Sequence, residues 1–444
     1  MGLSVYFEGG MDMKIDESLH LFCDDTNEKA VVFNLKTSKQ YELPYKKAKE
    51  LDEYTINKIN SLACAPVEIE YKKLEHLRLI LTNKCNLKCI YCYADGGSYH
   101  QKLGEMDFVI VQKTIKFFYS KYKYIHQISF FGGEPLIKID LIEQSCAYIN
   151  SYCKKNEIPL PIYSMVTNAT LMDDKAIEII SKYNIHINVS LDGPKEFNDT
   201  QRIFVEGNKS VFDLVDKNIS KLRKKQSFSI ESTCSNHIDE FGYTFKDIQD
   251  YFRNRYSISR VNVSAAIIVD KVDDRLKLSN NEYVGNSTLA MVKKFFNQKE
   301  FVFNDLIIRL LNTYFTNYYC STFCDAGITQ FSIWMNGDVY PCQLFLGKED
   351  YKLGNIDELN DKVLNEFKNK QLKNFDKCKK CGYIRFCQTC LRRRDEIKES
   401  TEYCEDIKSA VDYFLDSLLS LKYQNKPRYE LLMKGYMKFY EENQ

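Results

Sequence analysis

The chain has 444 residues and a formal net charge of +1, so no overall electrostatic field favours a nucleic-acid partner. Hydrophobic residues make up 44% and charged residues 28%, as in ordinary folded proteins, and the length suggests about three modules. We find no run of about 18 apolar residues for a membrane span and no apolar signal region at the start. Sixteen cysteines in such a chain therefore predict reduced thiols in a cytoplasmic protein rather than a disulfide framework.

Residues 1–10 precede a second methionine, Met11, and are interpreted as a remnant outside the fold. In residues 11–70, alternating apolar and polar residues predict strands at 19–25, 29–35 and 39–44, followed by helices at 44–54 and 55–63. This order suits a small cap on the next domain. It also resembles the winged-helix modules that bind the leader of a ribosomally made peptide as an added strand, here along the edge at Tyr41, Leu43 and Tyr45.

Residues 71–315 alternate strand-like and helix-like segments in six βα repeats. Such repeats predict an α/β fold in which a parallel sheet is connected by crossover helices. The expected strands are 76–82, 126–133, 162–168, 185–193, 228–233 and 260–269, and the expected helices are 109–122, 140–155, 173–183, 211–225 and 242–256.

Three cysteines with CxxxCxxC spacing, Cys85, Cys89 and Cys92, follow the first strand of this module. A structural zinc site normally has four side-chain ligands, and no histidine lies near this loop to complete one. Three thiolates on a 4Fe-4S cube would leave one iron open for a substrate or cofactor. The spacing therefore favours an iron-sulfur cluster with an open position over zinc.

With Tyr91 just before the third cysteine, the loop resembles the signature of the radical S-adenosylmethionine (SAM) enzymes. The resemblance implies a partial (β/α)6 barrel of TIM type, and a cluster whose open iron binds the amino and carboxylate groups of SAM. It also implies that the reduced cluster cleaves SAM to methionine and a 5'-deoxyadenosyl radical. The loop follows the first strand, where the rule for closed barrels places active sites.

The segment FFGGEP contains Gly132, Gly133 and Glu134 after the second strand. Glycines let the backbone approach a ligand closely, and a carboxylate accepts hydrogen bonds from an ammonium group, although a plain strand-to-helix turn would also use Gly-Gly. The radical SAM family has a GGE motif here that contacts the SAM amino group. The resemblance therefore assigns Glu134 to that contact.

Polar residues also follow the third and fourth strands, at Asn168 in TNAT and at Ser190 and Asp192 in VSLDGP. Helix caps or turns are one interpretation. The resemblance implies instead that they line the SAM pocket, although Ala169 stands where the family usually has glycine. Farther on, NDTQR resembles the family's HDxxR segment. The resemblance implies that its Arg202 binds the SAM carboxylate through two guanidinium nitrogens, with a surface salt bridge as the alternative.

Residues 320–412 hold eight cysteines, whose CxxC pairs alone would also fit zinc ribbons. Their order around NGDVYPC resembles the SPASM extension of radical SAM proteins, which carries two auxiliary 4Fe-4S clusters, although two residues rather than the usual three precede Cys390. The resemblance implies that one cluster uses Cys320, Cys324, Cys342 and Cys390, and that without Cys320 its open iron would hold a substrate thiolate. It implies that the other uses Cys378, Cys381, Cys387 and Cys404. Residues 413–444 are expected to form helices that cover the barrel or support the cluster domain.

The resemblance thus predicts an enzyme with SAM and three 4Fe-4S clusters. Gln343 stands where anaerobic sulfatase-maturing enzymes have an aspartate base, which disfavours sulfatase maturation because a carboxamide is a poor proton acceptor. We expect maturation of a ribosomal precursor peptide with a leader, by an oxidative cross-link such as a cysteine thioether, with a flavodoxin- or ferredoxin-type electron donor. C–C or C–O cross-links, epimerisation and a non-enzymatic zinc-binding adaptor remain alternatives. No nucleic acid or membrane partner is expected.

Overall fold

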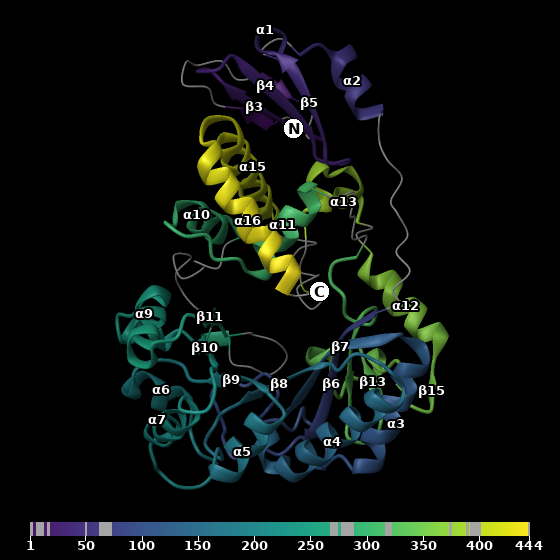
Figure 1. Cartoon of the computed structure of the whole chain (residues 1–444), viewed down its shortest axis with the longest axis vertical. Coiled ribbons are helices and arrows are strands. Elements are labelled where there is room, and N and C mark those ends of the chain that lie inside the picture. The colour runs from purple at the N-terminus through teal and green to yellow at the C-terminus, as the bar shows by residue number, and fades with distance from the viewer. Residues whose placement is uncertain are drawn as a thin grey trace. The chain divides into compact units, whose positions relative to one another are not determined.

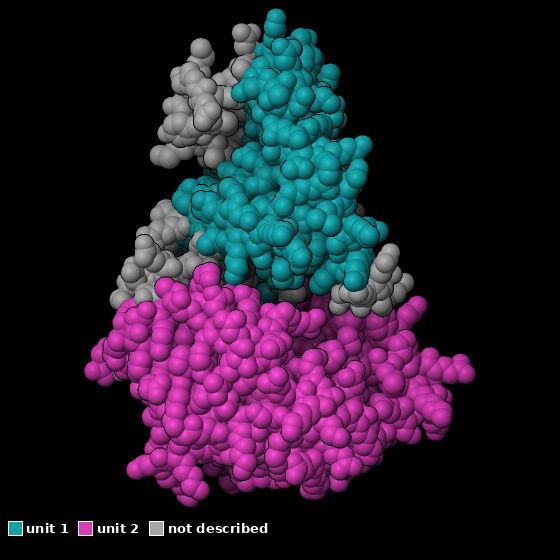
Figure 2. All heavy atoms as spheres, turned by 60° about the vertical axis from the view of Figure 1, so that its left-hand side comes forward, with its two compact units in different colours: residues 1–69, 285–324, 371–444 teal, residues 70–284, 325–370 magenta. Residues whose placement is uncertain are grey.

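The computed structural model describes residues 3–5, 13–15, 18–48, 51–61, 73–266, 274–276, 288–315, 322–372, 375–387, 390 and 401–442. The chain divides into two compact units (Figure 2). Unit 1 contains residues 1–69, 285–324 and 371–444, and unit 2 contains residues 70–284 and 325–370. Each unit joins segments that are distant in the sequence, and the domain boundaries predicted above stay a prediction.

Unit 2 is built on one sheet with the strand order β11-β10-β9-β8-β7-β6-β12-β13-β14-β15 in its described part (Figure 1). The strands from β11 to β12 are parallel, and the last three are antiparallel. The parallel strands are β6 (Lys73–Thr82), β7 (Tyr124–Gly132), β8 (Ile162–Thr167), β9 (His186–Ser190), β10 (Ser229–Cys234), β11 (Val261–Ala265) and β12 (Gln330–Ile333). The antiparallel strands are β13 (Asp338–Tyr340), β14 (Gly354–Asn355) and β15 (Glu358–Leu359).

Crossover helices connect the parallel strands, and several begin at side-chain caps. Asp107, Asp173 and Ser210 each accept a hydrogen bond from a backbone N–H of the first helical turn, and Thr244 forms a capping box with Asp247. The helices are α3 (Phe108–Lys121), α4 (Ile139–Lys155), α5 (Asp174–Lys182), α6 (Lys195–Gln201), α7 (Val211–Leu222), α8 (His237–Glu240) and α9 (Phe245–Tyr256), with a 3-10 turn η1 (Pro135–Lys138). The predicted α/β fold with a largely parallel sheet is confirmed.

The two faces of this sheet differ in polarity. Leu77, Leu79, Ile128 and Phe130 point to one face, and all four are buried in the core. The residues that alternate with this core point to the opposite face and are largely polar: His76, Arg78, Gln127, Ser129, Ser164, Asn188, Ser190, Ser229, Glu231, Thr233, Asn262 and Ser264. The interior of a closed barrel is usually filled by branched apolar side chains, so this polar inner face suits a binding surface.

Unit 1 contains a three-stranded antiparallel sheet, β3 (Leu19–Asp24), β4 (Lys29–Asn34) and β5 (Lys39–Pro44), in that order. The helices α1 (Tyr45–Ala48) and α2 (Glu53–Ser61) follow, and a short hairpin pairs β1 (Leu3–Val5) with β2 (Met13–Ile15). The three strands and two helices agree with the sequence prediction, and β5 lies at an edge of this sheet. The winged-helix identity stays a prediction.

Helices from the rest of unit 1 cover this sheet (Figure 1). Phe22, Val31 and Phe33 share one apolar core with Phe414 and Leu415 of the long C-terminal helix. The helices are α10 (Thr288–Asn297), α11 (Asp305–Phe315), α13 (Asp376–Lys380), α15 (Thr401–Gln424) and α16 (Lys426–Glu442), while α12 (Asp361–Gln371) belongs mostly to unit 2. The sequence predicted the terminal helices but not their packing on the N-terminal sheet. Within the described ranges, no helix is both long and apolar enough to cross a membrane.

A buried histidine connects the sheet of unit 1 to the helix α15. The two ring nitrogens of His20 lie 3.0 Å from Asp412 Oδ1 and 2.9 Å from Asp416 Oδ1. Burial alone would lower the pKa of His20, but the two carboxylates raise it to about 10. The Tyr383 hydroxyl, from the 3-10 turn η6 (Gly382–Arg385) between Cys381 and Cys387, donates to Asp412 as well. His20 is therefore a charged bridge between distant segments.

Candidate active site

The loop that carries Cys85, Cys89 and Cys92 follows β6 in unit 2. Backbone hydrogen bonds attach this loop to the C-terminal end of α6 and the segment after it, from Ile90 N to Gln201 O at 3.0 Å and from Lys88 N to Ile203 O at 2.7 Å. These main-chain contacts hold the loop without using the cysteine side chains, which remain available as ligands.

The two glycines of FFGGEP allow the next strand to approach this loop closely. Gly132 has φ +145, and a Cβ there would collide with Thr82 O. A Cβ at Gly133 would collide with Lys84 O, one residue before Cys85. The sequence analysis explained the glycines by close approach of a ligand. The structure shows close approach between two backbones, and the glycines also line the cavity described next.

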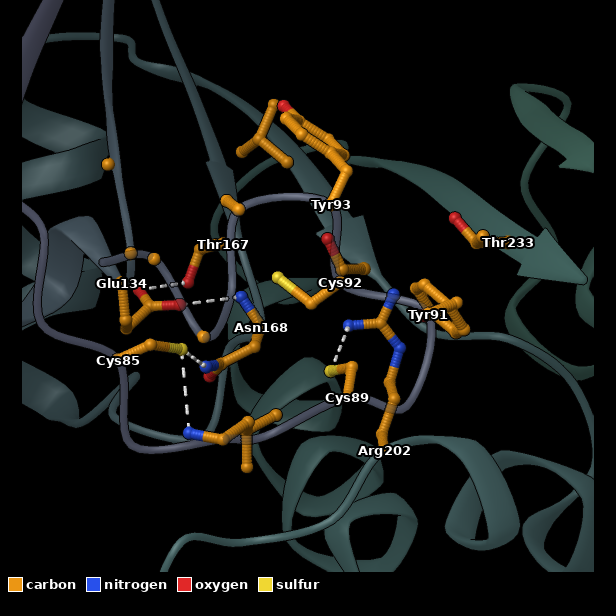
Figure 3. Close-up of a pocket in the computed structure, with 18 of the residues that line it drawn as sticks. Cys85, Cys89, Tyr91, Cys92, Tyr93, Glu134, Thr167, Asn168, Arg202 and Thr233 are labelled. Carbon is orange, nitrogen blue, oxygen red and sulfur yellow. Dashed lines mark hydrogen bonds between the residues drawn. The ribbon is translucent and has the colours of Figure 1, made fainter. Parts of the chain in front are cut away.

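A cavity of about 210 Å³ lies at the C-terminal ends of the parallel strands of unit 2 (Figure 3). Strand-end residues and the cysteine loop share its wall, and the inner faces of β7, β8, β10 and β11 contribute to it. The predicted site residues among its lining are Cys85, Cys89, Tyr91, Cys92, Gly132, Gly133, Glu134, Asn168, Ser190 and Arg202. The structure thus brings together ten residues from five segments of the sequence.

The thiols of this cavity have N–H donors nearby. Cys85 Sγ accepts from Leu87 N at 3.4 Å and from Asn168 Nδ2 at 3.8 Å, and Cys89 Sγ accepts from Arg202 Nη1 at 3.9 Å (Figure 3). Burial raises the pKa of Cys85 to about 11 and that of Cys89 to about 12, so these thiols ionise only with a cation bound to them. Three thiols on one cavity, with donors to two of the sulfurs, fit a 4Fe-4S cluster.

Glu134 provides the negative charge of the cavity and is 1% exposed. Its Oε1 accepts from Thr167 Oγ1 at 2.7 Å and from Leu136 N at 3.0 Å, and its Oε2 accepts from Asn168 N at 2.8 Å. Burial raises the pKa of this carboxyl group. The two oxygens are held rigidly, and Oε2, with one protein donor, has room for a further hydrogen bond from a ligand.

Arg202 provides the positive charge. Its Nη2 lies 3.0 Å from Asp192 Oδ1, and its guanidinium lies 5.7 Å from the centre of the Tyr91 ring. The Tyr91 hydroxyl donates to Asp192 Oδ2 at 2.7 Å. Asp192 is not among the described lining residues, and it also accepts from Thr233 N at 3.0 Å. Asp192 thus orients Arg202 and Tyr91 from behind the cavity wall, and the surface salt bridge considered for Arg202 is instead a buried one.

Arg202 also retains an unused donor. Its Nε is buried and has no hydrogen-bond partner among the described residues. A buried donor without a partner costs about 1–3 kcal/mol, so it indicates a ligand with an acceptor group. The opposite charges of Glu134 and Arg202 on one cavity fit the zwitterionic amino-acid end of SAM.

Asn168 and its neighbours form a tight turn at the end of β8. Asn168 Nδ2 donates to Asn86 Oδ1 at 2.9 Å, and Asn168 Oδ1 accepts from Thr170 N at 3.0 Å. Ala169, where the family usually has glycine, has φ +57. A Cβ in this left-handed conformation is strained by about 1–2 kcal/mol. The turn conformation that favours glycine is therefore kept despite the alanine.

The C-terminal cysteines lie in both units. Cys378, Cys381, Cys387 and Cys404, the predicted ligands of one auxiliary cluster, all belong to unit 1. Of the other predicted set, Cys324 and Cys390 are in unit 1, Cys342 is in unit 2, and Cys320 lies outside the described residues. Gln371 Nε2 donates to Cys324 Sγ at 3.2 Å. In the described part of the chain, no group of three His, Cys, Asp or Glu side chains is placed to hold a single metal ion.

Two family models match the chain. The Radical SAM superfamily model matches residues 79–254, and the SPASM model, an iron-sulfur cluster-binding domain, matches residues 324–391. The chain carries a radical SAM domain followed by a SPASM domain. The two domains imply SAM with a 4Fe-4S cluster and auxiliary iron-sulfur clusters, respectively.

Known proteins resemble this radical SAM/SPASM chain over most of its length. A cysteine-type anaerobic sulfatase-maturating enzyme of Clostridium novyi is 27% identical over 386 residues, which cover 80% of this chain and 98% of the relative. A solved structure of anSMEcpe with bound AdoMet and Cp18Cys peptide covers 79% of this chain and 98% of its own, with a TM-score of 0.62 and 22% identity. Streptococcus suis SuiB bound to S-adenosylmethionine covers 88% of this chain and 97% of its own, with a TM-score of 0.51 and 17% identity. The two structures show the shared fold.

Several lining residues of the radical SAM cavity were missed by the sequence analysis. Tyr93, Thr167, Thr233 and Ser264 all belong to the lining. Thr233 and Ser264 are inner-face residues of β10 and β11, so strand alternation carried to the strand ends would have found them. Thr167 was missed because its role is indirect, as a donor to Glu134.

Proposed function

We propose that this radical SAM/SPASM enzyme installs an oxidative thioether cross-link, from a cysteine sulfur to an acceptor carbon, in a ribosomally made precursor peptide. The observation that supports the SAM chemistry is the cavity shared by three thiols, an anionic Glu134 and a cationic Arg202. A peptide substrate is supported by the fold that the chain shares with anSMEcpe, whose solved structure holds a Cp18Cys peptide.

In this proposal, Cys85, Cys89 and Cys92 hold the SAM-binding cluster. Glu134 Oε2 accepts from the SAM ammonium group, and Arg202 Nε donates to the SAM carboxylate. Asn168 and Ser190 line the rest of the SAM site, and Asp192 keeps Arg202 and Tyr91 in place. When bound, the loop cluster supplies the electron that cleaves SAM, and auxiliary clusters supply an acceptor for the electrons that cross-linking releases.

We assign the C-terminal cysteines to two auxiliary 4Fe-4S clusters, for three clusters in total. Cys378, Cys381, Cys387 and Cys404 would hold one, and Cys320, Cys324, Cys342 and Cys390 the other. Anaerobic reconstitution should give about twelve iron and matching sulfide per chain, at four iron per cube. Stoichiometric zinc without sulfide would exclude the assignment.

The decisive experiment uses a precursor peptide encoded beside this gene. Incubation of a cysteine-containing peptide of this kind with reconstituted enzyme, SAM and a flavodoxin or chemical reductant should lower its mass by two hydrogens per cross-link. Alkylation should then fail at the bridged cysteine. Fragmentation of the product would locate the acceptor carbon and separate a thioether from a C–C or C–O bond. A peptide whose mass and alkylation do not change excludes cross-linking, and deuterium uptake would then reveal epimerisation.

Sulfatase-type maturation is a second candidate, and the 27% identity to the Clostridium novyi enzyme favours it. Against it stands Gln343 after Cys342, because a carboxamide does not take up a proton at neutral pH. A cysteine-containing sulfatase peptide, offered under the same conditions, tests this candidate. Conversion of that peptide at a rate above that of the neighbouring precursor would replace the cross-linking proposal.

Leader binding along β5 completes the proposal. The exposed positions of β5 are Lys39, Glu42 and Pro44, and its outer edge is not covered by another strand in the described residues. Deleting residues 11–70 would remove Phe22 and Val31 from the core of unit 1, so a milder change is preferable. Proline at Glu42 removes one backbone donor from the strand and should weaken leader binding. Unchanged affinity for a labelled leader would refute this role.

A further inference from the structure

Arg78 is a positive charge on the inner face of the unit 2 sheet. It belongs to β6, is partly buried, and its Nη1 donates to Gln330 Oε1 at 3.1 Å. Among the described residues it forms no ion pair with a carboxylate, and burial lowers its pKa from the ordinary value. A buried guanidinium without a counter-charge is unfavourable unless a ligand supplies one.

Among the described side chains of this face, no carboxylate neutralises Arg78. Burial lowers the pKa of His76 to about 3, so this neighbour on β6 is uncharged. Glu231 lies on β10, which three other strands separate from β6 in the sheet, and there it accepts from Asn262 at 2.8 Å. The phenols of Tyr93 and Tyr99 lie near Arg78, and a phenol carries no charge at neutral pH.

Arg78 lies next to the candidate active site. Tyr93 lines the SAM cavity and lies close enough to Arg78, Cys92 and Cys342 to interact electrostatically with all three. A group bound at Arg78 would therefore lie near both the cysteine loop and a predicted auxiliary ligand. In sheet register, the residues opposite Arg78 are Ser129 on β7 and Ser332 on β12. Ser332 is fully buried, and its Oγ has no hydrogen-bond partner among the described residues.

We propose that Arg78, with Ser332 beside it, forms a carboxylate-binding subsite that positions the peptide substrate next to the SAM cavity. The carboxylate comes from an aspartate or glutamate side chain of the peptide or from its C-terminus. The polar inner face around Arg78 suits the main-chain amides of such a peptide. This inference rests on the proposed peptide substrate, and it adds the acidic group that the enzyme selects.

Binding of defined peptides to the reconstituted, SAM-loaded enzyme tests the subsite. Three labelled five-residue peptides are compared, each with one cysteine: one with a glutamate and capped ends, its glutamine counterpart, and the glutamine peptide with a free C-terminal carboxylate. Fluorescence anisotropy should show at least about tenfold tighter binding of one or both acidic peptides, as expected for a charged hydrogen bond. The arm that binds more tightly identifies the source of the carboxylate.

Substitutions of Arg78 show whether this preference depends on the guanidinium. R78Q should bind all three peptides equally. R78K should retain part of the preference for acidic peptides, because lysine keeps the positive charge but lacks the paired N–H donors of the guanidinium. R78Q should fold at least as well as wild type because it removes a partly buried charge that no carboxylate pairs, which thermal unfolding checks. R253Q, at a partly exposed arginine of α9 outside this site, is the matched control and should behave as wild type.

The possible failures are distinguishable. If the wild type binds all three peptides equally, the proposal of a carboxylate subsite at Arg78 is wrong, whereas the proposal of a peptide substrate is unaffected. An unchanged preference in R78Q, with altered iron content or auxiliary-cluster potential, overturns it in favour of Arg78 as a counter-charge for Cys342. If no peptide binds, saturation-transfer NMR with glutarate, a small dicarboxylate, tests the carboxylate subsite by itself. A signal with wild type that R78Q lacks supports the subsite while the peptide proposal fails, and no signal with either protein overturns the subsite.

Discussion

The cysteine loop of unit 2 and the cysteine-rich part of unit 1 are held in different ways. The loop at Cys85 is fixed by main-chain contacts, with Gly132 and Gly133 packed directly against the backbone before it. The segment from Cys381 to Cys387 is instead connected by side chains, through Tyr383 to Asp412 and through Arg385 to Lys36 O. A site held by backbone contacts tolerates almost no added volume, whereas a site held by side chains depends on charge and on distant segments.

Cysteine substitutions should give the sharpest contrast between the two regions. Changing Cys85, Cys89 or Cys92 to Ala should abolish formation of 5'-deoxyadenosine and remove about four iron per chain, because we propose each thiol as a ligand of the SAM-binding cluster. Changing Cys378 or Cys381 to Ala should remove a similar amount of iron but leave SAM cleavage measurable. Chromatography of 5'-deoxyadenosine and iron analysis measure both effects.

The control for these variants is C153A, since Cys153 is a buried thiol on α4 that shares a hydrogen bond with the Tyr119 hydroxyl and lies outside the cavity. It should retain both iron and SAM cleavage. If C378A or C381A abolished SAM cleavage as completely as C85A, the two regions would not be separable and the contrast would be wrong.

Glu134 tests the charge on the cavity. E134Q should weaken SAM binding about tenfold to a hundredfold, the range expected for a lost charged hydrogen bond, in titration calorimetry under anaerobic conditions. Because burial raises the pKa of Glu134, SAM affinity of the wild type should fall as the pH is lowered through that raised value, and E134Q should lack this dependence. E105Q is the control, since Lys138 and Lys84 hold the pKa of exposed Glu105 at about 2. An identical pH profile for E134Q and wild type would contradict the assignment.

Gly133 tests the backbone contacts. G133A should lower the free energy of unfolding by about 3 kcal/mol, because its Cβ meets Lys84 O and the strand and loop must separate. G207A is the matched control: Gly207 has φ +88 but nothing near its Cβ, so only backbone strain of about 1 kcal/mol is expected. Chemical denaturation of the two variants gives the difference, and equal losses would show that close packing at Gly133 is unimportant.

His20 tests the side-chain contacts of unit 1. Its pKa is raised from 6.5 in the unfolded chain to about 10 in the fold, so its stabilisation is complete below pH 6.5 and is lost as the pH rises toward 10. H20Q should cost about 2 kcal/mol at pH 6 and less at pH 9, since it removes charged hydrogen bonds to Asp412 and Asp416. H186Q, at an exposed histidine of β9, should cost almost nothing. A loss for H20Q that does not change with pH would contradict a charged His20.

The same contrast explains what could be predicted from the sequence. The parallel strands and the CxxxCxxC loop follow from local periodicity and spacing, and the role of Glu134 follows from the resemblance of GGE to the radical SAM motif. The bond between Asp192 and Arg202 involves residues ten apart, on either side of α6, and the resemblance assigned each of them separately to the ligand. The bridge from His20 to Asp412 connects residues 392 positions apart, and no local pattern indicates it. Features that depend on partners distant in the chain were therefore the ones missed.

Ala169 should show the smallest effect and the opposite sign. At φ +57 the backbone of Ala169 is strained by its Cβ, and glycine relieves this strain. Glycine also gives the unfolded chain more conformational entropy, so the net increase in the free energy of unfolding of A169G should be at most about 1 kcal/mol. A176G is the matched control, because Ala176 lies in the regular helix α5, where glycine costs about 1 kcal/mol. Denaturation midpoints should therefore move in opposite directions. The turn holds Asn168, whose backbone N–H donates to Glu134, so SAM affinity should be retained in A169G. A destabilised A169G would mean that contacts of the buried Ala169 methyl group outweigh its backbone strain. Side-chain packing, as well as main-chain geometry, would then hold the turn after β8.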